Sequence, residues 1–190
     1  MRPVVIPAML AIGLLAGCAG MPPPGQIPNL PANLQQGLAE PGREAINLVS
    51  SVFPNPATVR GRPAVAAAAV SDLEWLAASL PVDQRWTSMP PTVAGQVARG
   101  RDAVRGTFGI PAEASPNAVI AAFDGAAQAL SVGNAQAASA ALATVTGAGN
   151  APRAVALLSD LPAIPAAAQA ASQAQQGLVQ MDQISGNRPR

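Results

Sequence analysis

The sequence predicts an all-α protein because of its alanine content, its few aromatic residues and the positions of its prolines and glycines. Nonpolar residues make up 49% of the 190-residue chain, of which alanine supplies about half, whereas aromatic residues make up 3%. Alanine is the best helix former, and the 20 prolines and 17 glycines lie mostly between alanine-rich segments. We therefore expect a single bundle of about six or seven short, antiparallel, Ala-rich helices with a core of small, closely packed side chains.

The first three helices are expected at residues 43–52, 63–80 and 91–108, where nonpolar residues recur three or four positions apart. These stripes consist of Ile46, Val49 and Phe53, then Val65, Ala69, Leu73, Leu76 and Leu80, then Val93, Val97, Val104 and Phe108. Prolines end the first two helices because a proline removes a backbone donor. Gly100 lies on the nonpolar face of the third helix, where a glycine lets another helix approach closely.

The remaining helices are expected at residues 116–132, 135–145, 151–161 and 165–185, with glycines or prolines between them. Ser115 and Pro116 are typical of an N-cap and a first helical position. The helices at 116–132 and 135–145 are short neighbours and predict an antiparallel hairpin. In the last helix, Ala167, Ala171, Ala174, Leu178 and Met181 form a seam of the kind found in antiparallel bundles.

The N-terminus carries the features of a secretory signal peptide over residues 1–17. Arg2 is followed by a nonpolar run, Val4–Leu15, which is too short to span a bilayer because a spanning helix needs about 20 residues. The four residues Leu15-Ala16-Gly17-Cys18 then contain the one cysteine of the chain. This segment resembles the lipobox of bacterial lipoproteins. An ordinary signal peptide with an incidental cysteine, or a buried free thiol, are the alternatives.

The resemblance implies cleavage between Gly17 and Cys18, a diacylglyceryl group on the Cys18 sulfur, and usually an acyl chain such as palmitate on the new N-terminus. Two or three acyl chains anchor a protein stably, whereas one chain holds it weakly. By the same resemblance, Ala19 after the cysteine favours the outer membrane over the inner membrane. The expected location is thus the periplasmic face of the outer membrane.

The segment that follows is rich in proline and poor in charge. Residues 18–42 contain six prolines, a composition that favours an extended, semi-rigid spacer. We expect a lipidated, disordered tether over 18–42, a helical domain over 43–185 and a disordered tail over 186–190. Leu30, Leu34 and Leu38 leave open a short helix that rests on the domain.

The composition excludes the most frequent kinds of active site. The chain has no histidine, lysine or tyrosine, and no cysteine besides Cys18, so a Ser-His-Asp triad, a Cys-His pair, a lysine Schiff base and most zinc sites are absent. The net charge of +1 and the scattered arginines argue against nucleic-acid binding. We expect no enzyme, no cofactor and no metal site.

Two groups of side chains are candidates for a ligand or partner surface. Trp75 and Trp86 are the only tryptophans and either frame a cleft with Arg85 as an anion contact or serve as packing anchors. Arg101 and Arg105 lie four residues apart and either bind phosphates or carboxylates or pair locally with Asp102 in solvent.

The carboxylates of Asp72 and Glu74, on either side of Leu73 and beside Trp75, either form a pair for acid/base chemistry or lie on a solvated helix face, and we expect the solvated face. Residues two apart do not face each other on a helix.

The function that the sequence favours is a non-enzymatic structural or protein-interaction module on a lipid-anchored envelope protein. Its expected partners are the membrane, through the lipid, and envelope proteins or cell-wall components. The alternative is a carrier for a hydrophobic or amphiphilic ligand, which requires an enclosed nonpolar cavity. The sequence leaves the oligomeric state open.

Overall fold

The computed structural model describes residues 26–37 and 39–186 and is all-helical over these residues, as the sequence predicts. The α-helices are α1 (Ala32–Gln35), α2 (Pro41–Val52), α3 (Pro63–Ser79), α4 (Pro91–Phe108), α5 (Pro116–Ser131), α6 (Ala135–Thr146), α7 (Ala151–Ser159) and α8 (Pro165–Gly186). Two short 3-10 helices, η1 (Pro56–Val59) and η2 (Gln84–Trp86), lie in the connections. The predicted signal peptide, Gly17, Cys18 and residues 187–190 of the predicted tail lie outside the described residues.

The helix ends follow from local capping. The Ser115 hydroxyl accepts a hydrogen bond from the backbone N–H of Ala118 at 3.2 Å, which confirms the predicted N-cap of α5. The carboxylate of Glu40 does the same for α2, through the N–H groups of Gly42 and Arg43. Gly109 ends α4 with φ of 70°, a left-handed conformation that glycine adopts without strain.

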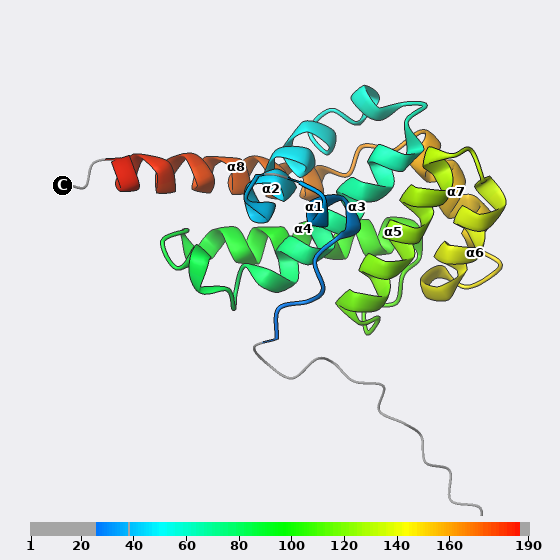
Figure 1. Ribbon diagram of the computed structural model, residues 1–190, viewed down its shortest axis with the longest axis horizontal. Coiled ribbons are helices and arrows are strands. Elements are labelled where there is room, and N and C mark those ends of the chain that lie inside the picture. Colours follow the sequence, from blue (N-terminus) through cyan, green and yellow to red (C-terminus); the bar gives the residue numbers. More distant parts are fainter. Residues whose placement is uncertain (1–25, 38, 187–190) are drawn as a thin grey trace, which may run out of the picture.

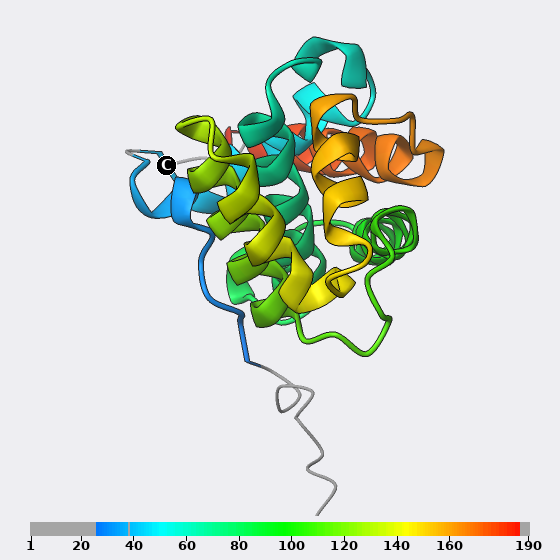
Figure 2. The same ribbon diagram turned by 90° about the vertical axis from the view of Figure 1, so that its right-hand side faces the viewer.

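Helix α3 is the centre of the fold, surrounded by α2, α4, α5 and α7 (Figures 1 and 2). Every residue from Ala69 to Ala77 is buried, polar residues included. The sequence predicted one nonpolar stripe on this helix, and that stripe packs in or against the core. From Ala69 to Ala77 the opposite face is also buried, whereas Ala64, Val65 and Ala68 nearer the start of the helix are partly exposed.

Helices α4 and α8 form a closely packed antiparallel pair. A Cβ atom built on Gly100 would lie 2.6 Å from the Cβ of Ala170 and 3.2 Å from the Cα of Ala167. Toward the other end of the pair, a Cβ on Gly177 would lie 3.3 Å from Val93. Residue numbers therefore rise along α4 as they fall along α8. The close approach predicted for Gly100 is confirmed, and the small residues of the α8 seam make it possible.

The packed domain begins earlier in the chain than residue 43. Helix α2 starts at Pro41, and residues 26–36 already lie against the helical body (Figure 1). Leu34, which is 3% exposed, belongs to the core. The second half of the predicted tether is therefore part of the fold, because Leu34 gains burial and its neighbours gain hydrogen bonds. Of the short helix left open over Leu30, Leu34 and Leu38, the structure shows the four residues of α1, which include Leu34; Leu30 precedes α1, and Leu38 lies outside the described residues.

Among the described residues, no helix combines the length and the nonpolar character that crossing a membrane requires.

Candidate functional site

The connection between α3 and α4 forms a surface cleft. Helix α3 ends before Pro81, and the chain turns through η2 before α4 begins at Pro91. The Asp83 carboxylate organises this turn, since it accepts hydrogen bonds from the backbone N–H of Arg85 at 3.0 Å and from the Arg85 guanidinium. These hydrogen bonds lower the pKa of Asp83 and keep its buried carboxylate ionised.

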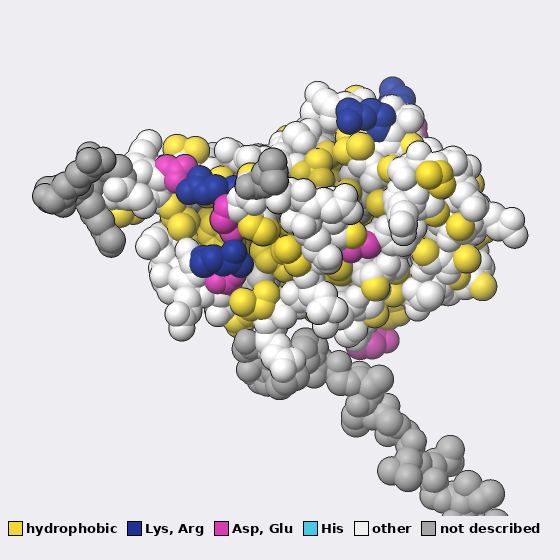
Figure 3. Space-filling view, in the orientation of Figure 1, with side chains coloured by type: hydrophobic (Ala, Val, Ile, Leu, Met, Phe, Trp, Pro, Cys, Tyr) yellow, Lys and Arg dark blue, Asp and Glu magenta, His cyan; other side chains and the backbone are white. Residues whose placement is uncertain are grey.

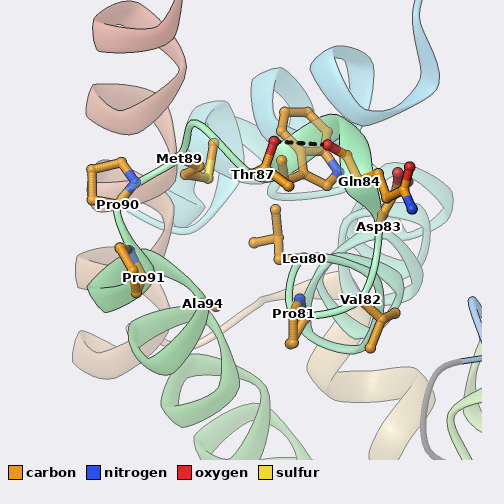
Figure 4. Close-up of a pocket in the computed structure, with 11 residues that line it drawn as sticks. Leu80, Pro81, Val82, Asp83, Gln84, Thr87, Met89, Pro90, Pro91 and Ala94 are labelled. Atoms are coloured by element: carbon orange, nitrogen blue, oxygen red, sulfur yellow. Dashed lines mark hydrogen bonds between the residues drawn. The ribbon is translucent and has the colours of Figure 1, made fainter.

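The cleft has a volume of about 400 Å³ and a mainly nonpolar lining. Figure 4 shows the end of α3 on one side, the start of α4 on the other and the η2 turn between them. The nonpolar residues that define it include Leu80, Pro81, Val82, Trp86, Met89 and Pro90. Val82 is 38% exposed, so part of the nonpolar lining is open to solvent. The cleft can hold a nonpolar side chain or ligand group.

Of the three residues predicted to frame a cleft, the structure places only Trp86 in its lining. Trp86 is 5% exposed, and its ring packs so closely on α2 that a Cβ on Gly42 would lie 2.1 Å from it. Arg85 turns instead to ion pairs with Asp83 and with Glu40, the latter at 2.8 Å. Trp75, 1% exposed on α3, is a core residue and does not line this cleft.

A buried ion pair joins α3 to α4. The Arg105 guanidinium donates to both carboxylate oxygens of Glu74, with a distance of 3.0 Å from Nε to Oε2. Arg105 also donates to the carbonyl of Ala112 at 2.8 Å, so it fixes the chain that follows α4. The side chains are 6% and 2% exposed, and the space around them has no room for a water molecule.

The structure corrects two predictions at this pair. Glu74 and Asp72 are buried, although the sequence predicted a solvated face for both. Arg105 pairs with Glu74 and not with Asp102. Arg101 does pair with Asp102, at 2.8 Å, which agrees with the alternative in which the arginines of α4 pair locally. The missed signal is the run Ala64–Val70, which is nonpolar on every side of the helix, a pattern typical of a buried helix, although Ala64, Val65 and Ala68 remain partly exposed.

A second buried carboxyl, Asp72, lies on α3 and contacts α1. Its Oδ2 atom accepts a hydrogen bond from the Asn33 amide at 3.1 Å, whereas its Oδ1 atom has no partner among the described residues. Burial, assisted by the charges of Asp124 and Glu44, raises the pKa of Asp72 to about 7 against the opposing effect of the hydrogen bond from Asn33. Asp72 is therefore a carboxyl that changes protonation near neutral pH.

Asp124 on α5 is the neighbouring acid. Its Oδ1 atom accepts a hydrogen bond from the Ser71 hydroxyl at 2.7 Å, and its Oδ2 atom accepts one from the backbone N–H of Ala32 at 2.8 Å. Asp124 also lines an open groove of about 620 Å³ between α1, α2, α3 and α5. In the part of the chain that is described, no cluster of acids has the geometry of a metal site.

Comparisons with protein families, with curated proteins and with solved structures found no match to this chain.

Proposed function

We propose that this chain is a lipid-anchored protein of the bacterial cell envelope, held at Cys18 on the periplasmic face of the outer membrane. Its helical domain is a non-enzymatic structural or protein-interaction module.

The observation that carries the proposal is the segment Leu15-Ala16-Gly17-Cys18 at the end of a short nonpolar run. The run is shorter than a spanning helix, and a cysteine at this position with small residues before it is the acceptor for lipid in the lipoprotein pattern. A secreted protein with a single cysteine has no disulfide partner within its own chain. Lipidation gives that thiol a role.

Two features of the domain support a structural or interaction role: a buried ion pair and a nonpolar surface cleft. The Glu74–Arg105 pair is enclosed by packed side chains, which is the environment of a structural ion pair. The cleft between α3 and α4 is open at the surface and nonpolar, which suits contact with a nonpolar group of another protein. We propose this cleft as the contact surface for an envelope protein.

The carrier alternative is less well supported. A carrier encloses most of a hydrophobic ligand, whereas the cleft at Trp86 and the groove at Asp124 open onto the surface. We therefore rank the interaction module first.

The experiment is acyl labelling of the wild-type chain and of Cys18→Ser in a bacterial host. We expect wild-type protein to incorporate labelled palmitate and to fractionate with membranes, and Cys18→Ser to lose both. Residue 18 precedes the helical body, so we expect Cys18→Ser to keep the helical circular dichroism of the wild type. A mature protein with an unmodified Cys18 thiol, or with residues 1–17 still attached, contradicts the proposal.

A further inference from the structure

Residues 26–36 form a strap that lies across the helical body, and we call this segment the N-terminal strap. Two of its backbone N–H groups bind side chains of α5: Asn29 donates to Asn117 Oδ1 at 2.8 Å, and Ala32 donates to Asp124 Oδ2 at the same distance. Leu34 enters the core. The strap is thus held by side-chain acceptors of other helices and by nonpolar packing of Leu34, Leu30 and two buried prolines, rather than by an extended run of its own helix.

The third polar contact of the strap is the hydrogen bond from the Asn33 amide to Asp72 on α3. Asp72 is fully buried here, and its second oxygen has no partner among the described residues. The charged groups that act on it are Asp124 from α5 and Glu44 from α2, both acidic. An ionised Asp72 under the strap is therefore poorly solvated and repelled by its neighbours.

We propose that the N-terminal strap is a pH-dependent latch, which is closed when Asp72 is protonated and opens more readily when Asp72 is ionised. Opening the strap exposes Asp72 to water, where its charge is solvated. Closing it returns the carboxyl to the interior next to Asp124 and Glu44.

The direction of the effect follows from linkage. The closed strap raises the pKa of Asp72 to about 7, from an ordinary value of 3.8. A carboxyl whose pKa is raised in the closed state binds more protons there than in the open state. The closed strap is therefore most stable in acid, loses stability as pH rises from about 4 to about 7, and changes little above that.

The latch sets how far the domain can move from the membrane, and this consequence rests on the proposed lipid anchor at Cys18. With the strap closed, residues 19–25 connect the anchor to the body and reach at most about 25 Å. With the strap open, residues 26–40 join the connection and add at most about 50 Å. Acidic conditions hold the domain near the membrane, and neutral conditions extend its range.

The test is amide hydrogen exchange of the purified protein, as isolated in detergent, between pH 5 and pH 8, with each rate divided by its intrinsic rate. We expect the protection of Ala32 and Leu34 to fall about tenfold per pH unit at the steepest, about 50-fold between pH 5 and pH 7, and then to level off. Amides in the middle of α4, such as Val97, keep their protection if opening is local. An equal loss at α4 overturns the latch in favour of global unfolding.

Three variants identify the responsible group. Asp72→Asn keeps the shape of the side chain without the charge and is expected to give pH-independent protection. Asn33→Ala removes the strap's bond to Asp72 and lowers protection at every pH. Asp102→Asn, an exposed acid on α4, is the matched control and keeps the wild-type profile.

A flat wild-type profile, or a wild-type slope in Asp72→Asn, overturns the proposal. Should Asp72→Asn fail to fold, the wild-type profile alone decides. Cys18→Ser is expected to show the same exchange profile as the wild type, so failure of the latch and failure of the lipid anchor are read separately.

Discussion

Glu74 and Arg105 carry opposite charges inside the helical body, where neither side chain is solvated. Removing two charges from water costs several kcal/mol per ion, and their mutual attraction offsets this only when the geometry is good. Here the guanidinium faces both carboxylate oxygens and uses a further N–H on the carbonyl of Ala112. The pair therefore holds α3, α4 and the segment after α4 in one arrangement.

The contribution of this pair is measurable by a double-mutant cycle. Glu74→Leu or Arg105→Met alone leaves the other charge buried without a partner and is expected to lower the free energy of unfolding by about 3–5 kcal/mol. The double variant removes both charges, and the freed carbonyl of Ala112 can bind water because Ala112 is exposed. We expect the double variant to be more stable than either single one in urea denaturation. Additive losses contradict this account.

The sequence did not reveal that these acids are buried, for a physical reason. Helical spacing places Glu74 opposite the nonpolar stripe of its helix and Asp72 at the edge of that stripe, seven residues after Val65, and an acid in either place is usually solvated. Their burial depends on Asn33 and Arg105, which lie 39 and 31 residues away in sequence. Such distant partners follow from the tertiary fold and not from the local pattern.

At the scale of elements, the seven predicted helices agree with α2–α8 to within two residues at every end, because proline and glycine fix most of these boundaries. Local residue types were sufficient to predict these helix ends. A proline at a first helical position marks where helical hydrogen bonding starts, and a glycine with positive φ marks where it stops. The strap was predicted as tether because its prolines and lack of charge resemble a spacer. The burial of Leu34 and the hydrogen bonds of Asn29, Ala32 and Asn33 to α5 and α3 distinguish it from a spacer, and these are tertiary contacts.

The contact between α4 and α8 depends on the absence of a side chain at one position. Gly100→Ala gains helix propensity but pushes a methyl group against the Cβ of Ala170 and the backbone at Ala167, so we expect a loss of about 1–3 kcal/mol. Gly106→Ala on the same helix meets nothing within 4 Å and is expected to add up to about 1 kcal/mol. Thermal unfolding of both variants compares them directly. Stabilisation by Gly100→Ala would show that the two helices separate easily.

At the scale of the whole molecule, several surface charges form ion pairs, and nonpolar side chains gather at the cleft between α3 and α4. On the face in Figure 3, basic and acidic side chains lie next to each other near α2 and α8, in agreement with the ion pairs of Arg43 with Asp182 and Arg85 with Glu40. Because these charges neutralise one another locally, attraction of a partner by net charge is weak. The contact with an envelope protein must then depend on nonpolar surface such as the cleft at Val82.

If binding depends on the nonpolar cleft, an envelope protein should contact the cleft more often than other parts of the surface. A photo-activatable residue in place of Val82, which lines the cleft, is expected to cross-link an envelope protein in native membranes. The same residue in place of Val132, which is 78% exposed and outside the cleft, is the matched control and should yield several-fold less product. Cys18→Ser is expected to lower the yield at position 82, since the lipid confines the domain near its partner and raises its effective concentration. Equal yields at positions 82 and 132 would place the contact elsewhere on the surface, because random collisions label the more exposed position at least as often.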